Sequence, residues 1–395
     1  MTGIMEKSRA TKPIFVGSVQ VGGGAPVIVQ SMCDTDTRDT LGTMRQINAL
    51  EEVGCEMARV AVPDLDAARC IRTLKAGTGI PLVADIHFDY RLALEALKGG
   101  IDCLRINPGN IRAMGGGEHK VEELARACND LGTPIRVGVN AGSLEVELVD
   151  KYGGPTAEAM VESALRHVEL LERYNFDMIK ISLKASDVWR TVEAYRLIAA
   201  KVDYPLHLGV TEAGAHVTGA IKTTAAFTIL LTEGIGDTLR VSLAASPLEE
   251  VKVGYEILKS LELRHHGVNV VACPTCGRIQ IDVEDLANRL EKGLAHIKFP
   301  ISVAVMGCEV NGPGEAKDAD IGIAGGKGEG MIFKRGKKFR KVKEADFYDV
   351  VVEEVEQMAA EGQLAAQQES GETDEAPPWE PPLPEGIKVR LPVVP

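Results

Sequence analysis

The sequence predicts an α/β protein in which a (β/α)₈ barrel, or TIM barrel, precedes a smaller α+β domain. Between residues 26 and 245, short apolar segments alternate with amphipathic stretches, a pattern typical of parallel strands joined by right-handed crossovers. Eight such units within about 220 residues match the size of a barrel of this kind. An open doubly wound sheet fits less well, because QSMCDTDT (30–37) lacks the glycine-rich turn expected after its first strand.

The first predicted element is a hairpin in FVGSVQVGGGAP (15–26), which we expect to cover the bottom of the barrel. Helical periodicity is clearest at 40–54 and 156–174. The eight barrel strands are predicted at 26–32, 57–63, 81–87, 102–107, 134–140, 177–184, 205–212 and 237–244.

Three regions follow from this pattern. Residues 1–262 form the barrel domain with its hairpin, and a boundary falls near LRHHGVN (263–269). Residues 263–361 form the α+β domain, with strands expected in VNVVAC (268–273) and PISVAVMGC (300–308) and a helix at 282–297. Residues 362–395 are acidic and rich in proline, which predicts a disordered tail.

The composition favours a globular protein of the cytoplasm. Of the 395 residues, 45% are hydrophobic and 26% charged, and the net charge of −13 argues against a nucleic-acid partner. No apolar run approaches the roughly 18 residues that span a bilayer, so no membrane association is expected. The N-terminus lacks the apolar core of a signal peptide. Eight cysteines in such a chain are more typical of thiols and metal ligands than of disulfides.

Polar side chains recur at every second position of the predicted strands. Pointing outward, they would lie under the helices, where unpaired charges are costly, so we expect them to line the C-terminal mouth of the barrel. Cations outnumber the carboxylates Asp85 and Glu212, which predicts a site for a small polyanion such as a diphosphate. The predicted binding residues are Arg59, Asp85, His87, Arg105, Asn107, Arg136, Asn140, Lys180, Ser182, Lys184, Thr211, Arg240 and Ser242.

Three of the eight cysteines have the spacing of a metal site. Cys273 and Cys276 form a C-x₂-C pair, and Cys308 follows in MGCEVNGPGEA (306–316). Zinc would require a fourth Cys or a suitably placed His, whereas an iron–sulfur cluster accepts a mixed ligand set, so we favour the cluster. Glu309 and Glu315 are the candidate fourth ligands. The NGPG turn can carry Glu315 back toward the metal, and we favour it.

Several motifs together resemble those of the bacterial 4-hydroxy-3-methylbut-2-enyl diphosphate synthases of the methylerythritol phosphate route to isoprenoids. The resemblance extends over about residues 12–345 and implies a TIM barrel joined to a domain resembling the sulfite reductase fold. It also implies a [4Fe–4S] cluster on Cys273, Cys276, Cys308 and Glu315. The motifs are VADIHFDYRLAL, LRINPGN, RVGVNAGSL, KISLKASDV, LGVTEAG, GIGDTLRVSLAA, ACPTCGR and MGCEVNGPGEA.

The reaction that the resemblance implies is a reductive ring opening. 2-C-methyl-D-erythritol 2,4-cyclodiphosphate takes up two electrons, loses a hydroxyl as water and becomes (E)-4-hydroxy-3-methylbut-2-enyl diphosphate. Glu212 is the expected proton donor and Glu315 the exchangeable ligand. Reduced flavodoxin or ferredoxin would supply electrons, and KRGKKFRK (334–341) is either its dock or a solvated basic loop.

The resemblance further implies a homodimer in which the cluster of one subunit closes the barrel mouth of the other. An alternative is a non-redox pterin-type barrel transferase with a structural zinc domain, which would leave the cysteines without a catalytic role.

Overall fold

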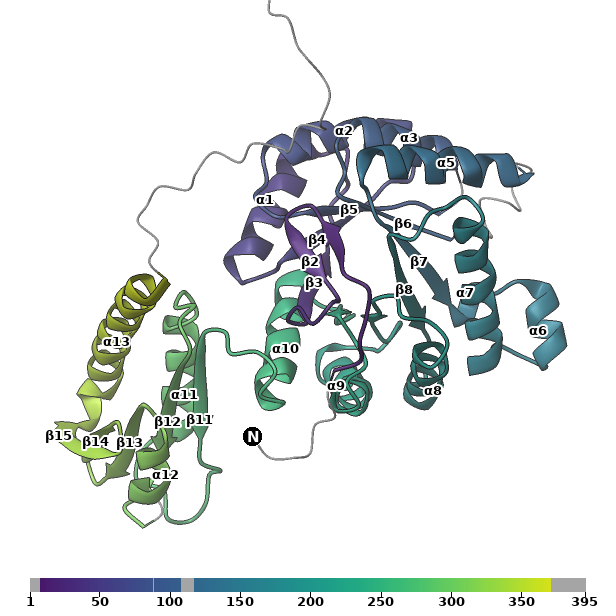
Figure 1. Ribbon diagram of the computed structural model, residues 1–395. Helices are drawn as coiled ribbons and strands as arrows, with labels where there is room; N and C mark the ends of the chain where they lie inside the picture. The colour runs from purple at the N-terminus through teal and green to yellow at the C-terminus, as the bar shows by residue number, and fades with distance from the viewer. Residues whose placement is uncertain (1–7, 88, 108–116, 311, 371–395) are drawn as a thin grey trace, which may run out of the picture. The chain divides into compact units, whose positions relative to one another are not determined.

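The computed structural model describes residues 8–87, 89–107, 117–310 and 312–370. Two compact units divide between His266 and Gly267, a few residues beyond the boundary predicted after residue 262. Figure 1 shows both units.

The first unit is a parallel barrel with helices around it (Figure 1). Its sheet has the order β8-β7-β6-β5-β4-β3-β10-β9, and a parallel bridge between Ile181 and Leu206 joins the two ends. The predicted TIM barrel is therefore confirmed. The elements are β1 (Ile14–Val16), β2 (Val19–Val21), β3 (Ile28–Met32), α1 (Thr40–Glu52), β4 (Met57–Ala61), α2 (Leu65–Ala76), β5 (Leu82–Asp85), α3 (Tyr90–Lys98), β6 (Cys103–Ile106), α5 (Gly117–Leu131), β7 (Ile135–Asn140), a 3₁₀ turn (Ala141–Ser143), α6 (Val146–Tyr152), α7 (Ala157–Glu172), β8 (Ile179–Lys184), α8 (Val188–Ala199), β9 (His207–Leu208), α9 (His216–Thr232), β10 (Thr238–Leu239) and α10 (Pro247–Ser260).

Local sequence explains where these elements start. Aspartates precede α1, α2, α3 and α8, and each of their side chains accepts a hydrogen bond from a backbone N–H of the first helical turn. The hairpin is β1–β2, and its Ile14, Val16 and Val21 pack on residues at the starts of β3 to β6, at the bottom of the barrel. β9 and β10 are shorter than predicted, and β9 ends before Gly209, a residue type that weakens strand pairing.

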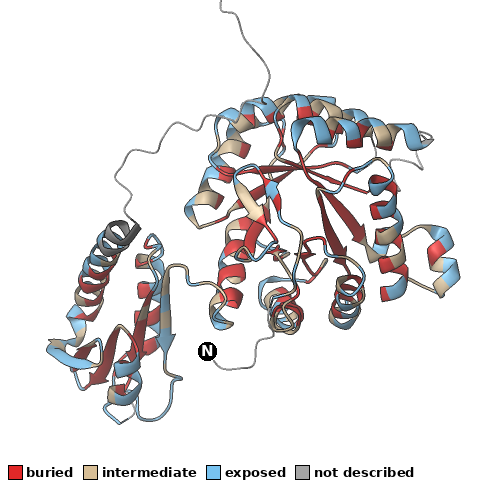
Figure 2. Ribbon diagram, viewed as in Figure 1, coloured by how far each residue is buried: buried red, intermediate tan, exposed pale blue. Residues whose placement is uncertain are grey.

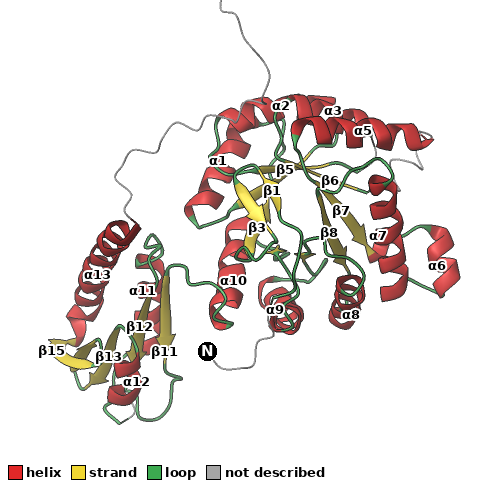
Figure 3. Cartoon of the chain, in the orientation of Figure 1, coloured by secondary structure: helices red, strands yellow, loops and turns green. Residues whose placement is uncertain are grey.

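The second unit is a five-stranded sheet of order β11-β12-β13-β14-β15 with helices on both faces (Figure 3). Alternate residues of β12 face the two sides: Val303 and Val305 pack with α11 and α13, whereas Ala304 and Met306 pack with α12. The elements are β11 (Val268–Ala272), α11 (Val283–Gly293), β12 (Ile301–Met306), α12 (Gly312–Asp318), β13 (Ile321–Gly326), β14 (Glu329–Lys334), β15 (Lys337–Lys343), a 3₁₀ turn (Glu344–Asp346) and α13 (Phe347–Ser370).

Two features of this unit differ from the sequence-based expectation. KRGKKFRK (334–341) is not a loop, because it forms the end of β14, a turn and most of β15. Helix α13 continues to Ser370, over the first residues of the predicted disordered tail; residues 371–395 lie outside the described residues. No helix in the described part of the chain is long and apolar enough to cross a bilayer.

Candidate active site

The polar residues of the barrel strands point inward, as their spacing predicts. In β7, Ile135, Val137 and Val139 pack in the core beneath the helices, so Arg136 and Asn140 face the barrel axis. The same alternation turns the polar residues of β4, β5, β6 and β8 inward. Figure 2 shows these strands as almost wholly buried.

A cavity of about 140 Å³ lies where the barrel strands end. The active site of a TIM-barrel enzyme usually lies at the carboxyl ends of the barrel strands. The structure brings eleven of the thirteen predicted binding residues together around this cavity: Arg59, Asp85, His87, Arg105, Arg136, Asn140, Ser182, Lys184, Thr211, Arg240 and Ser242.

Two carboxylates balance part of the positive charge of the cavity. Arg105 Nη1 lies 3.1 Å from Asp85 Oδ1, and His87 Nε2 lies 3.4 Å from Asp85 Oδ2. Arg240 Nη2 lies 3.0 Å from Glu250 Oε1 of α10. Burial alone would raise the pKa of Asp85, but Arg59, the His87 hydrogen bond and Arg105 outweigh burial and hold that pKa well below its usual range.

These ion pairs leave several guanidinium donors of the cavity without an oxygen acceptor. Arg59 contacts the sulfur of Met32, with its Nε 2.9 Å from Sδ, which is a weak acceptor. Buried donors at Arg136 Nε and Nη1, Arg105 Nε and Arg240 Nε have no hydrogen-bond partner among the described residues. Buried donors of this kind are costly unless something accepts from them, so the cavity is suited to an anion with many oxygens.

Burial and repulsion by neighbouring cations also lower the pKa of Lys184. Its pKa lies well below the usual value, first because of burial and then because of Arg136 and the other nearby guanidinium groups. The same causes lower the pKa of Arg136, although a guanidinium stays charged in proteins. An anion in the cavity would therefore favour protonation of Lys184 and bind more tightly when that amine is charged.

A second polar layer lies deeper in the barrel. Lys180 is fully buried and is absent from the cavity lining; burial lowers its pKa to about 8. His207 Nδ1 is 2.8 Å from Thr238 Oγ1, and burial, followed by the charge of Arg136, lowers the pKa of His207 well below its usual value. His207 is therefore neutral beneath the cationic cavity.

Two glycines, Gly138 within β7 and Gly209 directly after β9, make room for the cavity cations. A Cβ at Gly138 would lie 2.6 Å from Arg105 Nε, and a Cβ at Gly209 would lie 2.5 Å from Lys184 Nζ. Both distances are far below van der Waals contact, so any larger residue would displace these side chains. Glycine within a strand pattern is the sequence signal that could have identified both positions.

The remaining predicted barrel residues lie differently. Asn107 is buried directly after β6 and is not part of the cavity lining. Glu212 follows the lining residue Thr211, but its side chain is exposed and outside the lining. Its φ of 51° is in the left-handed region, which a glutamate seldom adopts and which occurs often at functional sites.

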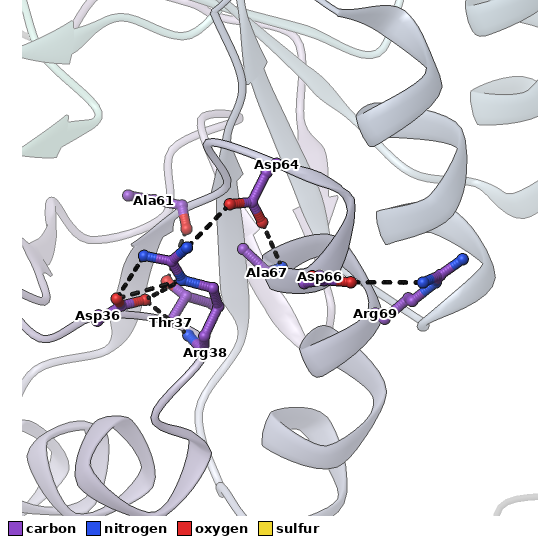
Figure 4. Close-up of polar contacts among 8 residues, drawn as sticks. All are labelled: Asp36, Thr37, Arg38, Ala61, Asp64, Asp66, Ala67 and Arg69. Carbon is purple, nitrogen blue, oxygen red and sulfur yellow. Dashed lines mark hydrogen bonds and ion pairs between the residues drawn. The ribbon is translucent and has the colours of Figure 1, made fainter.

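The loops after β3 and β4 are joined at the rim of the barrel (Figure 4). Arg38 bonds Asp36, with Nη2 2.7 Å from Oδ2, and reaches Asp64 at 3.1 Å. Thr37 donates to the carbonyl of Ala61 at 2.6 Å. Because the charged groups are about half exposed, these contacts fix the loops at little gain in stability.

The cysteine region of the second unit comprises Cys273, Cys276 and Cys308, which follow the neighbouring parallel strands β11 and β12. Gly307 N–H donates to Cys273 Sγ at 3.2 Å, and Gln280 N–H donates to the carbonyl of Gly307 at 2.8 Å. These bonds hold the C-x₂-C segment beside the segment of Cys308. Backbone N–H bonds to sulfur are typical of cluster thiolates, so the donor set fits an iron–sulfur group.

The two candidate carboxylates, Glu309 and Glu315, are both exposed. Glu315 lies on α12, and Glu309 Oε1 is directed at Gly326, where an added Cβ would lie 2.7 Å from it. Among the described residues, no three His, Cys, Asp or Glu side chains are close enough to hold one metal ion. The ligands of a multi-iron cluster bond different irons and so lie further apart than the ligands of a single ion.

Comparison with known proteins identifies the family. The profile of the GcpE TIM-barrel domain matches residues 11–255, and that of the GcpE protein C-terminal domain matches residues 269–357. The chain belongs to the GcpE family.

Curated relatives of this GcpE chain share one name. A protein of Geobacter sulfurreducens is 59% identical over 89% of this chain and 98% of its own length, and one of Symbiobacterium thermophilum is 56% identical over 90% and 95%. Both are named 4-hydroxy-3-methylbut-2-en-1-yl diphosphate synthase (flavodoxin). A solved dihydropteroate synthase of Yersinia pestis aligns with a TM-score of 0.44 at 12% identity, covering 65% of this chain and 100% of its own, a likeness too distant to bear on function.

Proposed function

We propose that the chain performs the reaction for which its relatives are named. The cyclic diphosphate 2-C-methyl-D-erythritol 2,4-cyclodiphosphate is opened reductively to (E)-4-hydroxy-3-methylbut-2-enyl diphosphate, with two electrons consumed and one hydroxyl leaving as water. The observation that carries this proposal is the cationic cavity, whose unpaired guanidinium donors suit a compact diphosphate. The pterin-type alternative is not favoured, because relatives at 51–59% identity carry the synthase name.

Within the barrel, the chain's own groups would bind and orient the substrate. Arg59, Arg105, Arg136 and Lys184 hold the phosphates or the ring near them, each by charge-assisted hydrogen bonds. Glu212 delivers a proton to the departing hydroxyl. Its place next to Thr211, a cavity residue, and its left-handed backbone support this role.

In the second unit, Cys273, Cys276, Cys308 and Glu315 would hold a [4Fe–4S] cluster. When bound, such a cluster supplies single electrons. Glu315 is exposed at the first turn of α12, and a carboxylate binds iron less firmly than thiolate does. Of the four residues, Glu315 would therefore be the most weakly held and most easily exchanged ligand.

The direct test is anaerobic turnover of the cyclodiphosphate by iron-reconstituted protein with reduced flavodoxin, with the product identified by mass spectrometry. Formation of the linear allylic diphosphate is expected. An unchanged substrate, with full iron content and an intact donor, would contradict the proposal.

The cluster ligands are tested by substitution. Glu315→Cys should still assemble a cluster, visible as absorbance near 400 nm, yet lose turnover because thiolate does not leave. An active Glu315→Cys enzyme with full iron content would refute the exchangeable ligand and make Glu309 the next residue to test.

We also propose a homodimer in which each catalytic site takes its barrel from one subunit and its cluster from the other. Mixing an Arg136→Met protein with a Cys308→Ser protein should restore part of the activity through hybrid dimers. No recovery, with subunit exchange verified by a mass-labelled partner, would contradict this arrangement.

A further inference from the structure

The outer edge of the second sheet carries a strong local positive charge. Residues 334–343 contain seven Lys or Arg and no Asp or Glu, in a chain whose net charge is −13. β15 lies at the end of the strand order, and every residue from Lys337 to Arg340 is exposed (Figure 2).

Few of these charges are neutralised by the chain itself. Lys334 Nζ lies 2.6 Å from Glu354 Oε2, and Lys341 pairs with Glu329. No described carboxylate lies within salt-bridge distance of Lys337, Lys338 or Arg340, nor of Arg335 or Lys343.

An exposed aromatic ring lies within this charge. Phe339 is 46% exposed, and the charged groups of Lys334 and Arg340 lie 5.5 Å and 5.6 Å from its ring centre. The register shifts here, since Phe333 pairs with Lys338 and Ile332 with Arg340, which leaves Phe339 as the extra residue of a β-bulge.

Protection of a sheet edge accounts for only part of this pattern. Lysines and a bulge on an edge strand prevent another strand from pairing with it. An exposed phenylalanine has the opposite effect, because it gives that edge an apolar contact. Aromatic and arginine side chains together are instead the residues enriched where proteins bind one another.

Strand pairing also connects β15 to the strand that precedes Cys308. Lys341 pairs with Met331, Met331 with Ala324, and Ala324 with Met306. Cys273 continues β11 beside Met306, and its N–H donates to Val305 O at 3.0 Å. Lys341 of β15 is therefore separated by three strand spacings, about 14 Å, from Met306 of β12, the strand that leads to Cys308.

We propose that β15 and the turn before it form the docking surface for an acidic electron-carrier protein, with Phe339 as the apolar anchor and the surrounding cations as the steering charge. The proposal rests on the proposed function, because a redox partner is needed only if the second unit takes part in electron transfer. A flavodoxin, the carrier in the relatives' names, is the partner to test.

The test compares two triple variants with the same change in net charge. Lys337→Glu, Lys338→Glu and Arg340→Glu reverse the exposed edge; Lys98→Glu, Arg126→Glu and Lys201→Glu reverse exposed charges on the barrel unit and serve as the control. Binding of purified oxidised flavodoxin is measured by titration calorimetry at low and high salt, so that the first readout does not depend on turnover.

We expect the edge triple to weaken flavodoxin binding by about tenfold or more and to lose most of the salt dependence, the scale of electrostatic steering. Phe339→Ala should weaken binding at least about fivefold at any salt concentration. Turnover driven by reduced methyl viologen should remain at the wild-type level in all of these variants, because a small reductant needs no docking surface.

Three results would overturn the proposal. The first is flavodoxin binding unchanged in the edge triple, or weakened equally in the control triple. The second is a changed oligomeric state of the Phe339→Ala protein with unchanged flavodoxin binding, which would make the edge a contact between copies of this chain. The third is wild-type protein that binds no flavodoxin although it turns over with methyl viologen. Absence of turnover with both reductants would instead refute the proposed function, and this proposal with it.

Discussion

The barrel cavity and the cysteine region both lie at the carboxyl ends of parallel strands, but they are positioned differently. The barrel cations belong to the strands themselves, and Arg136 and Lys184 are 1% and 7% exposed. The cysteines follow their strands, and Cys276 and Glu315 are exposed. The barrel strands therefore hold the anion site in place before any ligand binds, whereas only a few backbone hydrogen bonds position the thiols. A bound cluster should accordingly contribute to the stability of the second unit.

The largest effect is expected from removing a cysteine ligand. Cys273→Ser, Cys276→Ser and Cys308→Ser should each lose most of the iron and nearly all activity. Hydrogen exchange should become faster in residues 268–310 and stay unchanged in β4 to β8, because only the second unit depends on the cluster. Faster exchange throughout the barrel would contradict this separation.

A smaller effect is expected from the preformed cavity. Replacing Arg59, Arg105, Arg136 or Lys184 with Met should weaken substrate binding by about 1.5–3 kcal/mol, the scale of a charge-assisted hydrogen bond. Iron content should not change. If all four variants keep the wild-type KM and kcat, the barrel cavity is not the substrate site.

The pH dependence of stability shows whether the buried Lys180 stabilises the fold. It is buried without a carboxylate partner in the described residues, and its pKa is lowered to about 8. Because the unfolded state binds this proton more tightly, the free energy of unfolding should rise between about pH 8 and pH 10.4 in the wild type. Lys180→Met should remove that rise and stabilise the protein at pH 7 by about 1–3 kcal/mol. A destabilised Lys180→Met protein would mean that the lysine has a stabilising partner.

The glycine positions give the smallest and most local effect. Gly209→Ala should displace Lys184 and lower kcat/KM by about tenfold, since small misplacements of binding groups are costly. Gly142→Ala is the control, because a Cβ there meets no atom within 4 Å. Equal losses in both variants would indicate a general effect on the loops at the barrel mouth.

Sequence reasoning predicted the barrel and its inward-facing residues because both depend on periodicity. Period-two polarity marks Arg59 or Ser182 without knowledge of any neighbour. Contacts between distant segments carry no such signal. Glu250, the partner of Arg240, belongs to a helix and resembles an ordinary surface charge in the sequence.

The same limit explains where sequence and structure differ. Glu212 comes at the end of a predicted strand, but in the structure it has a left-handed backbone and is not among the cavity-lining residues; its role as proton donor stays a prediction. KRGKKFRK has the composition of a loop, but pairing with β14 makes most of it a strand. In β15, strand pairing overrides the local propensity of the sequence.

The proposed function requires that a substrate held in the barrel cavity of one subunit reaches the cluster of its partner. Electron paramagnetic resonance of the reduced, iron-loaded protein tests it most directly. Addition of the cyclodiphosphate should change the cluster signal, and Arg136→Met should shift this change to at least about tenfold higher substrate concentration. A signal change at the same concentration in both proteins would contradict the claim, because the substrate would then reach the cluster without the cavity.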